Sequence, residues 1–280
     1  MITPPDSSSP PLRSSAEQSV GGPDPHGGTS NVAGLAEYIL SLADDALVSA
    51  QRMGEWIAAS PQIEEDVALG NIALDLLGQA RSLLTYAGSL EDPVRTEDDL
   101  AYLRDESDFR NVHLVERERG DFGVAMARLL ILSTYLCELY DRLQASTDET
   151  LAAVAAKAVK EVDYHRDHAT MWVLRLGDGT DESHRRMQAG LDAEWPFVAE
   201  IFDGSYVDPR LVADGVAVDP STLRDAFDRR IAEVLGQATL TVPTAAPAEG
   251  GGRRGVHTPA MAPMLADLQG LARAHPGVAW

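Results

Sequence analysis

The spacing of apolar residues is the feature that most restricts how this 280-residue chain can fold. A first apolar stripe recurs every three to four residues, at Leu35, Ile39, Leu42, Ala46, Met53, Trp56 and Ile57. Such spacing predicts an amphipathic helix with one buried face. The same period continues through almost all of the chain from residue 31 to residue 240, so we expect an all-α protein.

Helix-breaking residues divide this pattern into segments. Ser60-Pro61 ends the first helix and begins a second, which carries Glu64, Glu65 and Asp66 in its first turn. Gly177-Asp-Gly179 ends another helix. We therefore expect long helices that start at about Leu35, at residues 61–87, at 121–144 and at 148–176, and shorter ones up to about 202, at 221–236 and at 261–274.

The order of these helices predicts the architecture. Residues 89–120 are charged and broken, with at most a short helix near residues 98–104. Two long helices, a crossover of this length and two more long helices are typical of a ferritin-like four-helix bundle. The alternative is a helical array, but the unequal helix lengths and the absence of a repeat count against it.

The ends of the chain differ from this bundle, which we place at residues 31–240. Residues 1–30 are rich in Ser, Pro and Gly, and too poor in large apolar side chains to order, so we predict a disordered tail. Residues 241–258 form a Gly/Pro-rich linker, and 259–280 a C-terminal helix that packs on the bundle. Arg253 and Arg254 lie in a Gly-rich stretch that could hold a phosphate, but it lacks the Gly-Lys-Ser/Thr ending of a Walker loop, so a mobile linker is favoured.

The charge balance excludes two classes of partner. The chain has 44 Asp and Glu against 23 Lys and Arg, a net charge of −21. Nucleic acids and anionic membranes both attract basic surfaces, so we expect neither as a partner. No apolar run reaches the length of a membrane span and no secretory signal is present, so we expect a cytoplasmic protein. The single cysteine, Cys137, forms no intrachain disulfide and fits a buried apolar position.

A metal site is the first chemical hypothesis that the sequence raises. Glu161 and His165 are four residues apart, so on a helix they share a face and could hold one metal ion. The di-iron proteins of this fold need a Glu from each of two helices and a Glu-x-x-His from each of the other two. The second helix offers only Asp75-Leu-Leu-Gly78, and on the fourth Val162 stands three residues before His165.

One further segment has the spacing of an acidic residue and a histidine three positions later, but it lies at the start of a helix and outside the four long helices. Asp181-Glu-Ser-His184 follows Gly-Thr at a helix start, where we expect Asp181 to be an N-cap. None of the four long helices contains a Glu-x-x-His.

Several other polar residues fall within apolar surroundings and need partners: Asp44, Asp45, Asp75, Gln79 and Glu138. Three interpretations remain open. The favoured interpretation is that these groups form internal ion pairs and hydrogen bonds, with Arg52, Arg81, Lys157 or His165 as partners. Otherwise Asp44, Asp75, Glu161 and His165 form a degenerate metal site, or an intact oxygen-activating centre. We assign no catalytic, cofactor-binding or metal-ligating residue to this chain.

The sequence resembles the phenylacetic acid catabolic protein family over about residues 33–280. The likeness is carried by Asn-Ile-Ala-Leu-Asp-Leu-Leu-Gly-Gln-Ala-Arg at 71–81 and by Ala-Lys-Ala-Val-Lys-Glu-Val-Asp-Tyr-His at 156–165. Shorter matches are Gln-Arg-Met-Gly-Glu-Trp at 51–56, Leu-Ala-Tyr-Leu-Arg-Asp-Glu at 100–106 and Leu-Gly-Asp-Gly-Thr-Asp at 176–181. The tail at residues 1–30 is an extension relative to the family.

The resemblance implies a component of a bacterial monooxygenase that forms an epoxide on the ring of phenylacetyl-CoA. It implies that a related ferritin-like subunit holds the di-iron centre and that this chain is its structural partner without a cofactor of its own. A separate flavin and iron–sulfur reductase would supply electrons from NADPH. Two alternatives remain: a self-sufficient oxygenase built on Asp44, Asp75, Glu161 and His165, and a stand-alone helical binding protein.

Overall fold

The structure is a computed structural model that describes Met1 and residues 27–278, and for residues 27–31 it describes the backbone alone. Most of the predicted tail therefore lies outside the described residues. In the part that is described, all regular elements are helical. The α-helices are α1 (Gly27–Gly54), α2 (Ile63–Ser89), α3 (His113–Glu116), α4 (Phe122–Leu143), α5 (Glu149–Gly177), α6 (Asp181–Glu194), α7 (Pro209–Ala213), α8 (Arg224–Gln237) and α9 (Met261–Ala274).

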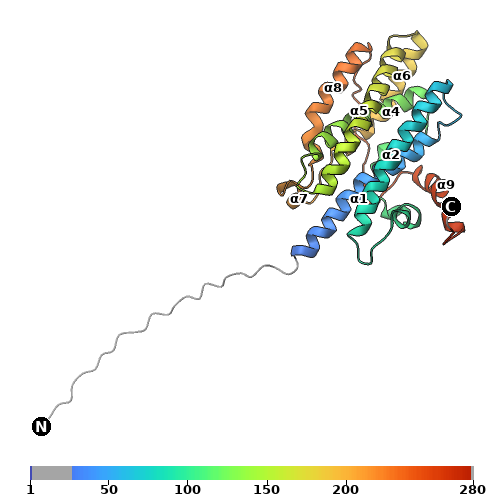
Figure 1. Cartoon of the computed structure of the whole chain (residues 1–280). Coiled ribbons are helices and arrows are strands. Elements are labelled where there is room, and N and C mark those ends of the chain that lie inside the picture. The colour runs from blue at the N-terminus through green and yellow to red at the C-terminus, as the bar shows by residue number, and fades with distance from the viewer. Residues whose placement is uncertain (2–26, 279–280) are drawn as a thin grey trace.

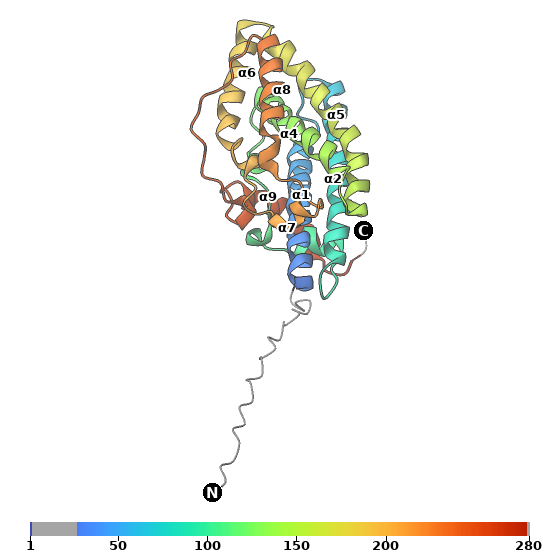
Figure 2. The same ribbon diagram turned by 90° about the vertical axis from the view of Figure 1, so that its left-hand side faces the viewer.

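Four of these helices form the bundle. α1 packs along α2, α4 packs along α5, and α2 contacts α5 (Figures 1 and 2). The crossover between α2 and α4 contains a π-helical turn, η1 (Asp99–Leu103), close to the predicted short helix. α6 and α8 cover the outside of α4 and α5. The prediction of a ferritin-like bundle with one long crossover is confirmed.

α4 is the central helix of the core. An unbroken run from Ala125 to Cys137 is buried, and the thiol of Cys137 has a pKa raised by burial to about 12. α4 is also the one helix in the described part that is long and apolar enough to cross a membrane, an exception to the sequence expectation. Its most apolar window is 83% buried inside the molecule, which is the position of a core helix.

Side-chain caps fix where the later helices begin. Asp121 accepts a hydrogen bond from Val124 N at the start of α4, and Asp148 does the same for Leu151 N at the start of α5. Thr180, not Asp181 as predicted, is the N-cap of α6. The Thr180 side chain accepts from Ser183 N, which leaves Asp181 as the first helical residue, where its negative charge is favourable at the positive end of the helix dipole.

The boundaries of the first two helices also differ from the prediction. α1 begins at Gly27, before the predicted start at about Leu35, because extending an existing helix costs little per residue. Residues 27–30, predicted to belong to the disordered tail, are therefore helical. It ends at Gly54, so Ile57 leaves the apolar stripe and is 64% exposed. α2 begins at Ile63, two residues after Pro61, because the carboxylate of Asp66 accepts hydrogen bonds from Ala58 N and Ser60 N and holds the turn outside the helix.

The C-terminal helix α9 has the predicted bounds and lies against the crossover. Gln269 is buried, and its Nε2 donates to the carbonyl oxygens of Ala101 at 3.1 Å and Arg104 at 3.0 Å. The end of the chain is thereby fixed to the segment that joins the two halves of the bundle.

Candidate functional site

One group of polar side chains lies between α2 and α5, where the sequence suggested half of a metal site. His165 is fully buried on α5, and its Nε2 lies 3.1 Å from Oδ2 of Asp75 on α2. His165 is one of the four cations that the sequence offered as partners for the interior carboxylates, and its partner is Asp75. The prediction that Asp75 is buried is wrong, because its side chain is 37% exposed at the groove between the helices. Burial lowers the pKa of His165, with Asp75 pulling in the opposite direction.

A second histidine–carboxylate pair lies one turn away. Nε2 of His168 and Oε2 of Glu65 are 3.0 Å apart, and both side chains are buried. The two atoms lack hydrogen-bond geometry, so the contact is electrostatic. Burial lowers the pKa of His168 as well. Sequence analysis did not single out this pair, although His165 and His168 are three apart on one helical face and Glu65 falls in register with buried Leu69.

Glu161 is close to His165 in sequence but has other partners. Its Oε2 accepts a hydrogen bond from Nε2 of Gln79 at 3.0 Å, and its Oε1 lies 3.1 Å from Nζ of Lys157. The same ammonium lies 3.8 Å from the point where a Cβ on Gly78 would be. The position that an imidazole would need on α2 therefore faces a lysine, and Lys157 is one of the partners that the sequence predicted.

The side chains of this bundle do not fit a di-iron centre. Such a centre needs carboxylates that bridge two ions and a histidine on each ion. In residues 27–278, no three His, Cys, Asp or Glu side chains converge in a way that could hold a metal ion. Each candidate donor instead has its own protein partner, as with Asp75 and His165 or Glu161 and Lys157.

The second polar group joins α1 to the crossover and the C-terminal segment. Asp44 forms an ion pair with Arg104 and accepts a hydrogen bond from the backbone N of Arg110 at 2.8 Å. Asp45 accepts from Nη2 of Arg253 at 2.7 Å and from Val112 N at 2.9 Å. All four charged side chains are at most 5% exposed.

Ion pairing of Asp44 and Asp45 is therefore as predicted, but the partners are not the predicted ones. Arg52 donates to the carbonyl oxygens of Glu116 and Ala260, and Arg81 pairs with Glu97 at the surface. Glu138 is half-buried, so its need for a partner is weaker than expected.

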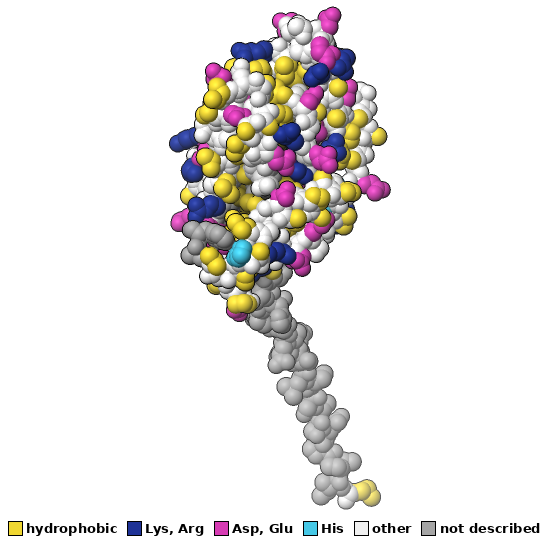
Figure 3. Space-filling view, turned by 90° about the vertical axis from the view of Figure 1, so that its right-hand side faces the viewer, with side chains coloured by type: hydrophobic (Ala, Val, Ile, Leu, Met, Phe, Trp, Pro, Cys, Tyr) yellow, Lys and Arg dark blue, Asp and Glu magenta, His cyan; other side chains and the backbone are white. Residues whose placement is uncertain are grey.

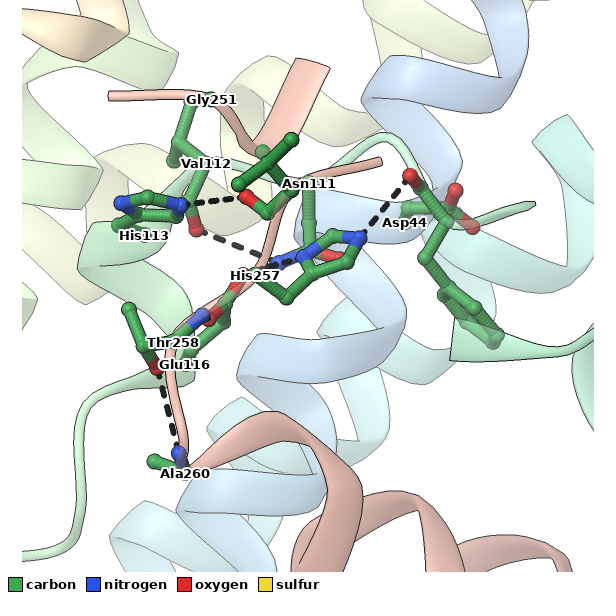
Figure 4. A network of polar contacts seen from close by, with 12 residues as sticks. Asp44, Asn111, Val112, His113, Glu116, Gly251, His257, Thr258 and Ala260 are labelled. Atoms are coloured by element: carbon green, nitrogen blue, oxygen red, sulfur yellow. Dashed lines mark hydrogen bonds and ion pairs between the residues drawn. The ribbon is translucent and has the colours of Figure 1, made fainter. Parts of the chain in front are cut away.

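The segment of residues 249–258, which we call the C-terminal strap, lies against α3 and α1 (Figure 4). Side chains of the bundle bind the backbone of the strap. His113 lies between the carbonyl oxygens of Glu249 and Val256, at 3.1 and 2.7 Å. Oε1 of Glu200 accepts from the backbone N of Gly251 and Gly252, at 2.8 and 2.9 Å.

One carboxylate on α3 completes the attachment. Glu116 is fully buried, with Oε1 2.6 Å from Nδ1 of His257 and Oε2 accepting from Thr258 N at 2.7 Å (Figure 4). Burial alone would raise the pKa of Glu116, but the hydrogen bonds from His257 and Thr258 lower it overall. The same pair raises the pKa of His257 in spite of its desolvation.

The strap does connect α8 to α9, but its glycines allow close packing rather than mobility. A Cβ on Gly252 would lie 1.9 Å from the carbonyl oxygen of Asn111, and one on Gly255 would lie 2.1 Å from that of Ser107. Gly255 also has a φ of 74°, which glycine adopts without strain. The expectation of a mobile linker is therefore wrong for the strap, because the crossover backbone passes directly against it.

The packing of the strap also argues against the suggested contact of Arg253 and Arg254 with a phosphate. Arg253 points inward, where it donates to Asp45 and to the carbonyl oxygens of Ser41 and Arg110, both at 2.8 Å. Burial raises the pKa of Asp45 to about 6 against the lowering effect of Arg253. Only Arg254 of the two arginines is exposed, so the strap does not present a pair of guanidinium groups to a ligand.

A hollow of about 1010 Å³ lies between the start of α1 and the crossover. Its arginines are already bonded within the protein: Arg95 pairs with Glu91, and Arg104 with Asp44. Asp92 and Asp108 add further negative charge to the walls. An anionic ligand such as a phosphate would meet these carboxylates, so the hollow does not have the charge of a coenzyme A site.

Comparison with known proteins places the chain in a family. A family model described as "Phenylacetic acid catabolic protein" matches residues 24–280. The chain is also 44% identical over 246 residues to the C component of the 1,2-phenylacetyl-CoA epoxidase of Escherichia coli (strain K12). That match covers 88% of this chain and 99% of the relative. With the ferritin-like fold and a match over nearly its whole length, the chain belongs to the phenylacetic acid catabolic protein family.

Proposed function

We propose that this chain is the structural, non-catalytic subunit of a multicomponent monooxygenase that epoxidises the ring of phenylacetyl-CoA. The relative that covers the chain is by name a component of such an epoxidase. In this proposal a second, related subunit carries the di-iron centre, a reductase supplies electrons, and the complex works in the cytoplasm during phenylacetate breakdown.

The observation that carries the proposal is the pairing of the interior donors. His165 is bonded to Asp75, His168 lies against Glu65, and Glu161 is bonded to Gln79 and Lys157. Oxygen activation by two iron ions needs donors that converge on the metal. Side chains that are already used to balance one another support a role in holding the bundle together, and not in redox chemistry.

The first experiment measures activity with and without the partner. The purified chain, supplied with ferrous iron, oxygen, phenylacetyl-CoA and a competent reductase, should give no epoxide above background. Addition of the di-iron subunit should give a stable complex and turnover. Epoxide formation by the chain alone, together with about two iron ions per chain retained through chelation, would contradict the proposal.

The second experiment tests the residues of the alternative enzyme. A His165→Ala variant should lose stability, because a buried imidazole and its bond to Asp75 are removed. In complexes that are shown by size-exclusion chromatography to be fully assembled, turnover per complex should stay within about threefold of wild type. Asp75→Asn is the matched control, because it removes the charge beside His165 but keeps the imidazole and the shape of the residue bonded to it. A thousandfold loss of turnover in the assembled His165→Ala complex would mean that His165 acts in the chemistry.

A further inference from the structure

α2 carries a second apolar stripe on the side that faces solvent. Ile63, Val67, Leu74 and Leu77 are 75%, 60%, 66% and 37% exposed. With Gly70 between them, these residues follow one another at intervals of four, three, four and three. We call these five residues the outer seam of α2. An alternation of four and three is the repeat by which one helix packs lengthwise against another.

The opposite side of α2 already has its partners within the bundle. Leu69, Ile72, Leu76 and Leu83 are fully buried in the core against α1 and α5. A helix that is apolar on both sides is expected to be covered on both sides. The outer seam is therefore a surface that residues 32–278 leave without a neighbour.

The outer seam lines a hollow of about 590 Å³ with mostly apolar walls. Apolar walls also come from Leu47 and Ala50 of α1, Tyr102 of η1 and Leu268 of α9, and the polar residues of the lining are Gln51, Asp66 and Asn71. Exposed Leu271 follows on α9. Figure 3 views the molecule from the side on which α9 lies in Figure 1, and it shows hydrophobic side chains exposed among scattered charged ones. From Ile63 to Leu77 the seam is about 21 Å long at 1.5 Å per residue, the length of a four-turn helix.

Gly70 gives an independent indication that something approaches this face closely. Glycine in the middle of a helix is less stable than alanine, so its presence needs a reason. Among the described residues, a Cβ on Gly70 would meet nothing within 4 Å, so no contact with them requires the glycine. Absence of a side chain at the centre of an exposed seam does, however, allow a second helix to come close.

We propose that the outer seam of α2 is a docking surface for one α-helix of a different protein, apolar along one face and basic at its edges. The four-three spacing selects a helix, because only a helix presents side chains at a matching interval. Asp66 lines the hollow, exposed Glu64 follows Ile63 in the sequence, and exposed Asp267 precedes Leu268, so acidic residues accompany the apolar ones. The net charge of −21 makes a second copy of this chain a poor occupant. This inference rests on the proposed function, in which the helix belongs to the di-iron subunit.

The main test introduces a charge into the seam. Leu74→Glu should leave the circular dichroism and melting temperature of the free chain nearly unchanged, because Leu74 is mostly exposed. Binding to the di-iron subunit, measured by isothermal titration calorimetry, should weaken at least a hundredfold. Val212→Glu is the matched control, since Val212 is an exposed valine on α7, outside the seam, and its affinity should stay at the wild-type value.

A second variant separates docking from folding, because it should change the stability of the free chain and the affinity of the complex in opposite directions. Gly70→Ala should raise the melting temperature of the free chain and weaken the complex at least tenfold, because the new methyl group lies in the interface. Gly236→Ala, in open space at the end of α8, should raise or keep the melting temperature without changing the affinity.

The outcomes distinguish this surface from the proposed function itself. If the wild-type chain binds the di-iron subunit and Leu74→Glu binds equally well, the docking assignment is overturned and the proposed function stands. If the wild-type chain alone forms dimers that Leu74→Glu converts to monomers, the occupant is a second copy and the assignment is again overturned. If the wild-type chain does not bind the di-iron subunit at all, the proposed function fails and this inference fails with it.

Discussion

Replacing Arg253 with Met removes the one side chain that ties the C-terminal strap to the interior of α1. The guanidinium group is 3% exposed and donates three hydrogen bonds, to Asp45 and to the carbonyl oxygens of Ser41 and Arg110. Met has a similar length and no charge, so the substitution changes electrostatics more than volume. Asp45 is left buried with Val112 N as its remaining partner.

The magnitude follows from what Asp45 can do in response. Breaking a buried ion pair by removing one partner costs about 3–5 kcal/mol. Asp45 can avoid part of this cost by taking up a proton, since burial already raises its pKa to about 6. A carboxyl group with a pKa of about 6 takes up a proton at pH 7 at a cost of about 1.4 kcal/mol, which limits the part of the loss that comes from the charge itself. The rest comes from the carbonyl oxygens of Ser41 and Arg110, which no longer receive hydrogen bonds. We expect Arg253→Met to lower the free energy of unfolding by about 3–4 kcal/mol at pH 7.

The assay is urea denaturation followed by circular dichroism at 222 nm, at pH 7 and at pH 5. At pH 5, below its pKa of about 6, Asp45 is already mostly protonated in the folded wild type, so its charge contributes little and the deficit of the variant should be smaller. The control is Arg254→Met, which changes the neighbouring exposed arginine and should cost less than about 0.5 kcal/mol. The double variant with Asp45→Asn should recover part of the loss. A loss of less than about 1 kcal/mol, or one that does not depend on pH, would refute this account of the strap.

Three further predictions concern the helices and the strap. Asp75→Ala should cost about 1 kcal/mol in the free energy of unfolding, well below the cost of breaking a buried pair, because Asp75 is 37% exposed and water can take its place on His165. Burial lowers the pKa of His165 and of His168 below the unfolded value of about 6.5, so the unfolded chain binds more protons and stability falls as the pH drops below 6.5. A variant with Gln at both positions should show a smaller fall in denaturation midpoint between pH 7 and pH 5.5. Gly252→Ala should lower the melting temperature by ten degrees or more, because its Cβ would lie 1.9 Å from the carbonyl oxygen of Asn111.

The helices and their order could be predicted because both depend on local signals. Apolar residues at helical spacing, a proline or a glycine pair at each break, and acidic residues at helix starts gave the long helices to within a few residues. The exceptions are local as well. Asp66 reaches back to Ala58 and Ser60 and delays the start of α2, which is a side-chain contact that spacing does not reveal.

The partners of the interior charges could not be predicted in the same way. Asp44 and Arg104 are 60 residues apart, and Asp45 and Arg253 are 208 residues apart. Which cation meets which carboxylate depends on how the crossover and the strap lie over α1. Glycines around Arg253 gave a misleading signal, because glycine suits both a mobile segment and a backbone that packs against another backbone. His165 could be named among the possible partners because it lies on a long helix of the bundle, but its pairing with Asp75 in particular could not be predicted.

The placement of the buried ion pairs suggests what they contribute. Arg104 with Asp44 holds the crossover to α1, Arg253 with Asp45 holds the strap to α1, and Arg128 with Glu194 holds α6 to α4. Buried ion pairs add little net stability compared with well-packed apolar residues, but each accepts only one arrangement of its elements. An interior that is fixed by specific pairs keeps the long connections in one register over α1. Under the proposal that the outer seam of α2 is a docking surface, such rigidity keeps that surface in a constant shape.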